Sequence, residues 1–201
     1  MEVAAKYTGG AFNSIQLTFL RFLIGGLMLL PFAISDLKKR RHSLTAGDLG
    51  YLLFLGVISI SISMTLLQVS MIGINANLAA IIICTNPLFT MIFAHFVADD
   101  PFTKRKAVVL LLMLIGLVIV ANPAEVLSGG IDPLYLGCAV VAAVTFGLYT
   151  AYGKRRIASI GGMAQNAFSF LFGCAVLLPV MLIADIPIFG GISAQTLPVL
   201  L

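Results

Sequence analysis

The sequence predicts an all-α, polytopic membrane protein, and three observations lead to that prediction. Six long apolar runs follow one another along the chain. Hydrophobic residues make up 60% of the 201 residues and charged residues only 10%, which is too little polar surface to cover a soluble domain of this size. The basic residues form short clusters between the apolar runs, without interleaved aromatic residues along one face. Membrane topology therefore explains the net charge of +4 better than nucleic-acid binding does, and we expect no nucleic-acid partner.

Each apolar run is interpreted as one membrane-spanning helix, because about 20 apolar residues cross a bilayer. Lipid offers no hydrogen-bond partners to the backbone, and the runs are too long and too evenly apolar for barrel strands. The predicted spans cover roughly residues 13–34, 49–72, 76–97, 107–121, 134–152 and 163–184. The fourth run is only about 22 Å long at 1.5 Å per residue, so we expect its helix to extend into the flanking residues.

The distribution of lysine and arginine predicts the orientation of these spans. Ten of the twelve basic residues lie in the connections after the first, third and fifth runs, and the connections between them contain none. Basic loops face the cytoplasm in most membrane proteins. The sequence therefore predicts a multi-pass protein of the cell inner (plasma) membrane with these loops in the cytoplasm. The ten residues are Lys38, Lys39, Arg40, Arg41, Lys104, Arg105, Lys106, Lys154, Arg155 and Arg156.

A short phrase occurs twice, as RFLIGGLMLLP from Arg21 to Pro31 and as SFLFGCAVLLP from Ser169 to Pro179. An offset of 148 residues aligns the two copies without a gap, and the shared Phe, Gly and Pro carry more weight than the shared leucines. The alternative is a coincidence between apolar helices. If the repeat is real, the first run corresponds to the sixth, five crossings later, and an odd number of crossings means that the two copies face in opposite directions. Inverted repeats of this kind are the architecture of many secondary transporters.

The same offset predicts the domain organisation. Residues 1–8 align with the end of the fifth run, and the tail from Thr196 aligns with the start of the second run at Asp48. Residues 1–122 would then hold a first repeat, made of the end of helix 1 and helices 2 to 5. Residues 131–201 would hold the start of a second, inverted repeat, made of helices 6 and 7 and the start of helix 8. We therefore expect a fragment of a protein with two five-helix units.

Four stretches resemble the EamA-type permeases of the drug/metabolite transporter superfamily. They are LRF followed by GGLMLLP, the pair of apolar runs in LLQVSMIGINANLAAIIICTNPLFTMIFA, the DPFT that begins at Asp100, and LMLIGLVIV. The resemblance implies ten helices, both termini in the cytoplasm, and movement of small metabolites or amino acids, frequently outward. The chain departs from the family pattern at Asp100, where a glutamate is common.

Arg21 is the most prominent polar residue inside a predicted span. It lies about eight residues, or roughly 12 Å, from the outer end of its helix. Insertion scales assign an arginine at the centre of a span a cost of about 2.5–3.5 kcal/mol, so we expect it to face protein or water. Its guanidinium could hold a substrate carboxylate or phosphate. The alternatives are an interhelical hydrogen bond and snorkelling toward the headgroups. Its repeat partner is Ser169, which makes the charge specific to one half.

Other polar residues lie at mid-span. Ser61, Thr65 and Gln68 are spaced i, i+4 and i+7, which would place them on one stripe of an α-helix that could line a cavity. Alternatively, serine and threonine hydroxyls bond to their own helix. Asn86 precedes Pro87, which has no N–H for the helix and predicts a kink in the third span. The candidate substrate-binding residues are Arg21, Ser61, Thr65, Gln68, Asn86, Thr145 and Ser169.

The sequence gives no indication of an enzyme, a cofactor or a metal site. The three cysteines lie in apolar runs without a CxxC pair, and neither HExxH nor GxSxG occurs. The expected partners are the lipid bilayer and a small-molecule substrate. Two other functions stay open at this stage, an intramembrane enzyme and a small membrane assembly subunit. In the second case the missing helices would come from another polypeptide or another copy of the chain.

Overall fold

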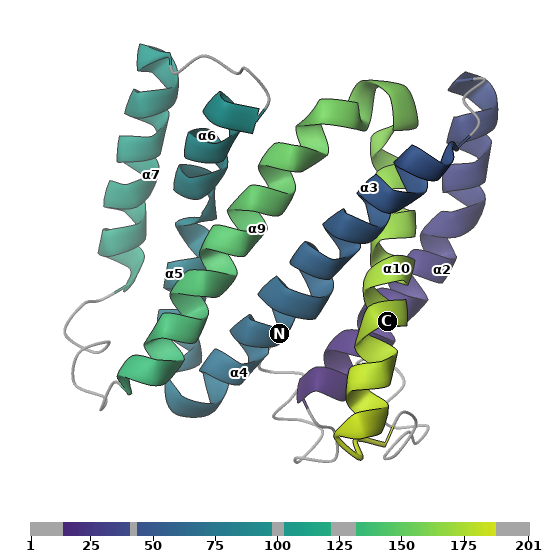
Figure 1. Ribbon diagram of the computed structural model, residues 1–201. Coiled ribbons are helices and arrows are strands. Elements are labelled where there is room, and N and C mark those ends of the chain that lie inside the picture. Colours follow the sequence, from purple (N-terminus) through teal and green to yellow (C-terminus); the bar gives the residue numbers. More distant parts are fainter. Residues whose placement is uncertain (1–13, 41–43, 98–102, 122–131, 188–201) are drawn as a thin grey trace. The chain divides into compact units, whose positions relative to one another are not determined.

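The computed structural model describes residues 14–40, 44–97, 103–121 and 132–187, which are drawn as coloured ribbon in Figure 1. Every regular element in these ranges is a helix, which confirms the all-α prediction. Five of the helical segments are long and apolar enough to cross a membrane. They are Ile15–Arg40, Ala46–Gly73, Leu78–Val97, Pro133–Ile160 and Gly162–Ile183.

The individual helices follow the predicted spans closely, with two interruptions. The second span is divided into three helical segments and the third into two. The fourth predicted span lies in a helix of 18 residues that begins with three basic residues, and this helix is not among the five segments that are long and apolar enough to cross a membrane. The elements are α2 (Ser14–Arg40), α3 (Ala46–Gly56), η1 (Val57–Met64), α4 (Thr65–Gly73), α5 (Ala76–Cys84), α6 (Asn86–Val97), α7 (Lys104–Ala121), α9 (Pro133–Ile160) and α10 (Gly162–Ile183).

Nine of the ten clustered basic residues lie within helices, which corrects the expectation that they form loops, and Arg41 lies outside the described residues. Lys38, Lys39 and Arg40 occupy the last turn of α2, and the second cluster begins α7 at Lys104. The third cluster lies inside α9, which continues to Ile160. Lysine and arginine have high helix propensity, and their long side chains can reach water from a helix that continues past the hydrocarbon. The apolar runs therefore underestimate the lengths of the helices.

The second span contains a π-helix, η1, that periodicity did not predict. The span begins with a capping box, in which the Asp48 N–H donates to the Thr45 hydroxyl at 3.3 Å and the Thr45 N–H donates to the Asp48 carboxylate at 3.1 Å. The eight residues of η1, VISISISM, follow directly on α3. A π-helix bonds i to i+5 and changes the direction in which later side chains point. Such segments are rare in proteins and occur frequently at functional sites.

The third span is interrupted where the sequence predicts a kink. The α5 helix ends at Cys84, and α6 begins at Asn86. The Thr85 N–H turns back to the Ile82 carbonyl at 3.0 Å, while the Leu88 N–H donates to the Thr85 carbonyl at 2.9 Å. Because Pro87 has no N–H to continue the α-helical ladder, the chain tightens at this point. The helix is therefore interrupted at the position where the kink is predicted.

The chain divides into two compact units, and their membership mixes the two predicted repeats. The first unit combines Met1–Ser61 with Ile157–Leu201, and the second comprises Ile62–Arg156. Both divisions fall inside helices, at Ser61 in η1 and at Arg156 in α9. The units are therefore distinct from the predicted repeats 1–122 and 131–201, and the repeat boundary stays a prediction.

In the first unit, α10 packs against both α2 and α3. The Phe22 and Phe170 rings meet edge to face with centroids 4.9 Å apart, and the Cys174 thiol approaches the Phe19 carbonyl at 3.6 Å. As residue numbers rise along α2 they fall along α10, so the two helices are antiparallel. On α3, a Cβ at Gly56 would collide with the Ser169 carbonyl. This absence of a side chain lets the α3 and α10 backbones touch.

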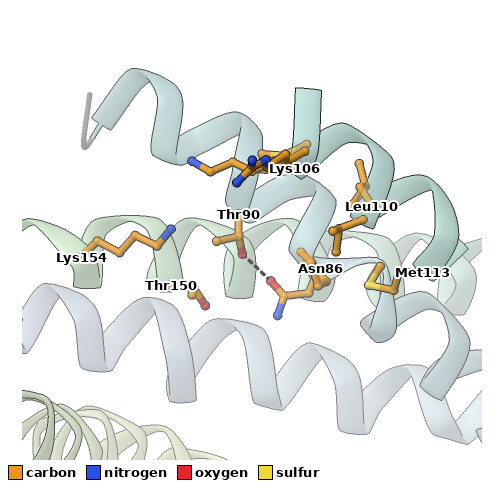
Figure 2. Close-up of a pocket in the computed structure, with 11 residues that line it drawn as sticks. Asn86, Thr90, Lys106, Leu110, Met113, Thr150 and Lys154 are labelled. Carbon is orange, nitrogen blue, oxygen red and sulfur yellow. Dashed lines mark hydrogen bonds between the residues drawn. The ribbon is translucent and has the colours of Figure 1, made fainter. Parts of the chain in front are cut away.

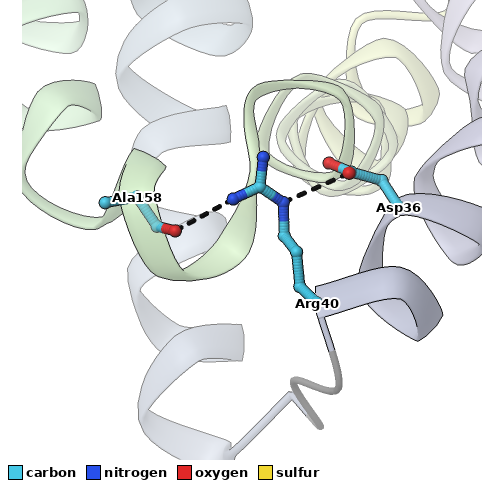
Figure 3. A network of polar contacts seen from close by, with 3 residues as sticks. All are labelled: Asp36, Arg40 and Ala158. Atoms are coloured by element: carbon cyan, nitrogen blue, oxygen red, sulfur yellow. Dashed lines mark hydrogen bonds and ion pairs between the residues drawn. The ribbon is translucent and has the colours of Figure 1, made fainter.

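In the same unit, the side chain of Arg40 forms polar contacts with Asp36 and Ala158 (Figure 3). The Arg40 side chain donates from Nε to Asp36 Oδ1 at 3.1 Å and from Nη1 to the Ala158 carbonyl at 3.0 Å. Ala158 belongs to the last turn of α9, whose carbonyls have no partner within the helix. Gly161 then turns the chain into α10 with a φ of 86°, a conformation that glycine adopts without strain.

In the second unit, small residues bring helices together. A buried cluster joins α4, α5 and the first half of α9, and it includes Leu67, Ala79 and Ala142. Ser63 donates its hydroxyl to the Ala142 carbonyl at 2.8 Å. Farther along α9, a Cβ at Gly147 would lie 2.6 Å from the Cβ of Phe89 on α6. The α6 and α9 helices are therefore in close contact, which positions the cavity described next.

Candidate functional site

The structure separates the seven predicted substrate-binding residues into two sets. Arg21, Ser61 and Ser169 belong to the first compact unit. The second unit holds Thr65, Gln68, Asn86 and Thr145. The predicted stripe of Ser61, Thr65 and Gln68 assumed a continuous α-helix, but Ser61 lies in η1 and the other two lie in α4. The π-helical turn changes the side-chain directions that the i, i+4, i+7 spacing would give.

In the first unit, the polar residues differ in whether they have a partner. Ser61 donates its hydroxyl to the Gly173 carbonyl at 3.1 Å and so serves the contact with α10. Ser169 is 0% exposed, and its hydroxyl has no hydrogen-bond partner. The Oε1 atom of Gln165, one turn earlier on α10, is also buried without a hydrogen-bond partner. Buried polar atoms are rarely left without partners, so Gln165 and Ser169 mark a place where a ligand or water could bind. Arg21 is partly buried.

In the second unit, the predicted residues differ in their surroundings. Thr145 donates its hydroxyl to the carbonyls of Val141 and Ala142 in its own helix, at 2.8 and 3.1 Å. This geometry matches the alternative interpretation, in which threonine serves its own helix. Thr65 and Gln68 are partly buried on α4. Asn86 alone of the four lies in the wall of the cavity.

The cavity has a volume of about 510 Å³ and lies among α6, α7 and α9 (Figure 2). This volume falls within the range of about 300–1,000 Å³ that is common for small-molecule sites. Cationic side chains line one end of it, and Figure 2 shows Lys154 and Lys106 there, with Leu110 and Met113 toward the opposite end. The lining residues are the cations Arg105, Lys106 and Lys154, the polar residues Asn86, Thr90 and Thr150, and the apolar residues Pro87, Met91, Val109, Leu110 and Met113.

Helical spacing explains how the sequence builds this wall. Asn86 and Thr90 are one turn apart on α6, and the Thr90 hydroxyl donates to Asn86 Oδ1 at 2.9 Å. Thr150 and Lys154 are likewise one turn apart on α9. Residues four apart lie on the same face of an α-helix, so each helix contributes one polar stripe to the cavity. Because α6 begins as a new helix at Asn86, the interruption before it sets which face of α6 packs against α9.

Sequence reasoning identified Asn86 but missed the other lining residues. The basic residues of α7 and α9 were interpreted only as topology signals, because loops were expected there. The signal that could have identified them is the continuation of i, i+4 spacing from the apolar run into the basic cluster. Arg105, Val109 and Met113 follow that spacing on α7, as Thr150 and Lys154 do on α9.

Comparison with known proteins agrees with the membrane-spanning helices. The profile of the EamA-like transporter family matches residues 1–122 of the chain. The chain belongs to the EamA-like transporter family. This family membership confirms the resemblance drawn from the sequence, and it opposes the alternative of an intramembrane enzyme. No solved structure matches the chain.

Relatives of this family member are named as transporters. An uncharacterized transporter of Clostridium kluyveri is 40% identical over 205 residues, covering 100% of this chain and 66% of the relative. An S-adenosylmethionine uptake transporter of Rickettsia prowazekii is 28% identical over 186 residues, covering 89% of this chain and 58% of the relative. An uncharacterized transporter of Archaeoglobus fulgidus is 23% identical, with 88% and 60% covered. The chain thus spans about 58–66% of the lengths of these three relatives.

Proposed function

We propose that the protein, as part of a longer polypeptide, is a secondary transporter that moves small polar or anionic metabolites across the inner membrane by alternating access. The observation that carries this proposal is the antiparallel contact of α2 with α10, in which the Phe22 ring meets the Phe170 ring. These two residues are equivalent at the 148-residue offset. Helices related by an inverted repeat meet in this way when a two-fold axis passes between them. An inverted repeat allows a central site to open to either side in turn.

The proposed substrate contacts combine a cation with unpaired polar atoms. In the first unit, Arg21 and Ser169 directly precede the two phenylalanines of the crossing. The guanidinium of Arg21 suits a carboxylate or phosphate group, and the unpaired hydroxyl of Ser169 could accept or donate one further hydrogen bond. Ser61, Thr65, Gln68, Asn86 and Thr145 remain proposed contributors, although the hydrogen bonds of Ser61 and Thr145 favour a structural role for these two.

The direction of transport is also part of the proposal. The family resemblance favours small metabolites or amino acids moved outward. The relatives from Rickettsia are named for uptake of S-adenosylmethionine, which has an amino acid group with a carboxylate. S-adenosylmethionine is therefore the first substrate to test, in both directions.

The test is a transport assay with the full-length protein in proteoliposomes. Labelled S-adenosylmethionine and a panel of amino acids and anionic metabolites are loaded inside or supplied outside. We expect Arg21→Ala to lower the rate for the transported substrate at least about tenfold, since a hydrogen bond to a charged group contributes about 1.5–3 kcal/mol. Lys39→Ala is the matched control, because Lys39 is an exposed cation on the same helix. Equal rates in the wild type and Arg21→Ala for every transported compound would remove Arg21 from the site.

The proposed topology has its own test. Single cysteines at Lys39 and Arg155, in otherwise cysteine-free full-length protein, are labelled from each side of the membrane. Both should react from the cytoplasmic side, since both belong to basic clusters. Labelling from opposite sides would contradict the inverted arrangement, and the transport mechanism based on it.

A further inference from the structure

We propose that α3 is a gate over the face of α10 that carries Gln165 and Ser169, and that it opens by bending at η1 to admit water and substrate. This inference rests on the proposed transport function, and it names the element that controls access to one of the proposed substrate contacts. It is supported by the burial of the two side chains, their missing hydrogen bonds, the glycine contact between α3 and α10, and the structure of η1.

The side chain of Ser169 is out of reach of a substrate while α3 packs against α10. It is 0% exposed, and Gln165, one turn earlier on α10, is 5% exposed. Residues four apart lie on one face of an α-helix, so both share a face with Gly173. That face is turned toward α3, which lies beside α10 in Figure 1, because a Cβ at Gly173 would lie 2.7 Å from the Gly56 carbonyl oxygen. Movement of α3 would therefore uncover the two side chains.

The packed arrangement leaves two hydrogen-bonding atoms unused. The Ser169 hydroxyl and Gln165 Oε1 are buried without a partner among the residues that the structure describes. A buried polar atom without a partner destabilises the conformation in which it occurs, and such atoms are rare in native structures. Water or a polar substrate could bind both atoms once α3 moves away. The gain of these hydrogen bonds would lower the free energy that opening requires.

The contact between α3 and α10 is formed by a glycine on each helix. A Cβ at Gly56 would collide with the Ser169 carbonyl, and Gly173 lies directly against the Gly56 backbone. Glycine has no side chain that must leave a hole in the facing helix when the two backbones separate. The unpaired atoms lie directly under this contact, so a displacement of α3 by about the width of a water molecule would be enough to hydrate them.

The π-helix η1 follows α3 directly and has the properties of a pivot. Seven of its eight residues, VISISISM, are β-branched or serine, and these residue types have lower α-helix propensity than alanine or leucine. Sharp helix kinks commonly occur at π-bulges. The segment is attached to other helices by the Ser61 hydroxyl, which donates to the Gly173 carbonyl, and by the Ser63 hydroxyl, which donates to the Ala142 carbonyl. Because α3 precedes both attachments, bending at η1 would move α3.

The first experiment measures access to position 169. Ser169→Cys and Ser63→Cys are made separately in otherwise cysteine-free full-length protein in proteoliposomes, and the rate of reaction with a small water-soluble methanethiosulfonate reagent is measured. Both serines are 0% exposed, but only Ser169 lies under α3. We expect Ser169→Cys to react at least about tenfold faster than Ser63→Cys, because reaction requires local opening. Equal rates would overturn the proposal.

The second experiment holds the gate open. Gly56→Ala adds a Cβ that collides with the Ser169 carbonyl, whereas a Cβ at Gly50, on the same helix, meets no atom of the described residues within 4 Å. In the Ser169→Cys background, we expect Gly56→Ala to raise the labelling rate at least about tenfold and Gly50→Ala to change it less than about twofold. Equal rates in the two variants would refute the gate. The unfolding midpoint shows whether each variant is folded, and if Gly56→Ala is not, the comparison of positions 169 and 63 still decides the proposal.

The third experiment tests η1 as the pivot. Deletion of Ile62, which is 38% exposed, removes one residue from η1 and allows α-helical hydrogen bonding to continue through the segment. Ile62→Ala is the matched control, because it shortens the side chain and keeps the length of the segment. We expect the deletion to lower the labelling rate of Ser169→Cys at least about tenfold without lowering the unfolding midpoint, and the control to change the rate less than about twofold. A folded deletion variant that is labelled as fast as the control would overturn the assignment of η1 as the pivot.

The labelling rates are independent of the transport assay, so the two proposals can fail separately. Rapid labelling of Ser169→Cys in a protein that transports none of the compounds tested would support the gate and count against the proposed function. Transport by a protein in which Ser169→Cys reacts as slowly as Ser63→Cys would support the proposed function and refute the gate.

Discussion

Replacing Ser169 by alanine should stabilise the protein in the absence of substrate. A hydroxyl buried without a partner costs about 1–3 kcal/mol, as estimated from protein mutations. Ser169 is 0% exposed and its hydroxyl has no partner, so Ser169→Ala removes that cost without creating a large cavity. For a protein of about 150–250 residues, 1 kcal/mol corresponds to about 2–4 °C in the midpoint of thermal unfolding. We therefore expect an increase of at least about 2 °C.

Ser63 provides the matched control. It is also a serine with 0% exposure in a membrane-spanning helix, but its hydroxyl donates to the Ala142 carbonyl at 2.8 Å. Interhelical hydrogen bonds in membrane proteins contribute about 0.6 kcal/mol on average, so Ser63→Ala should lower the midpoint slightly. The two substitutions remove the same atom from equally buried positions. Their effects should nevertheless have opposite signs.

The assay is thermal unfolding of the full-length protein in detergent, followed for the wild type and both variants with and without substrate. Addition of substrate should stabilise the wild type and Ser63→Ala by similar amounts, and Ser169→Ala less. A loss of stability in Ser169→Ala as large as that in Ser63→Ala would refute the reasoning, because it would mean that the Ser169 hydroxyl has a partner in the complete protein. A gain in stability with unchanged substrate binding would show that the hydroxyl does not contact substrate.

Two glycine substitutions test the helix contacts. Gly147→Ala should lower the unfolding midpoint by several degrees, because the new Cβ would lie 2.6 Å from the Phe89 Cβ and overpacking costs about 1–3 kcal/mol. Gly137→Ala, on the same helix with no atom within 4 Å, should leave the midpoint unchanged or raise it, and an equal loss in both would contradict the packing argument. Gly161→Ala should also destabilise, by about 1–2 kcal/mol for the left-handed conformation alone, because its φ is 86°. An unfolding midpoint of Gly161→Ala equal to that of the wild type would show that the turn before α10 relaxes without cost.

The spans and the kink could be predicted from the sequence because each rests on local chemistry. A run of apolar residues long enough to cross a bilayer has few alternatives to a helix, since lipid cannot hydrogen-bond the backbone. Pro87 interrupts the ladder wherever the helix packs, and the structure interrupts it at Thr85. Neither prediction depends on which helices contact one another.

The grouping of the polar residues could not be predicted, because it depends on backbone geometry that composition does not encode. Ser61 and Thr65 read as one stripe only if the helix keeps its α-helical period, and η1 breaks that period between them. The serines of η1 resemble any polar residues in a span, and nothing in VISISISM distinguishes i+5 from i+4 bonding. The cavity was missed for a related reason, since Lys154 contributes to it only because α9 stays helical beyond the apolar run.

The asymmetry between Arg21 and Ser169 follows from the same crossing that relates their helices. If the 148-residue offset is a true repeat, the contact of Phe22 with Phe170 lies on the two-fold axis, and the residues just before them occupy equivalent places. A symmetric pair of arginines there would place two like charges in one membrane-embedded unit, where each is expensive. One cation opposite a neutral hydroxyl suits a substrate with one anionic group.

Arg21→Lys separates charge from geometry at this position. Lysine keeps the positive charge but lacks the planar fork that binds a carboxylate through two hydrogen bonds. We expect Arg21→Lys to raise the KM for an anionic substrate about tenfold with a smaller effect on kcat, and Arg21→Gln to impair transport more strongly. Transport by Arg21→Lys that equals the wild type, together with failure of Arg21→Gln, would mean that only charge matters. Wild-type transport in both variants would make Arg21 a structural residue. The difference between Arg21 and Ser169 would then have no role in transport.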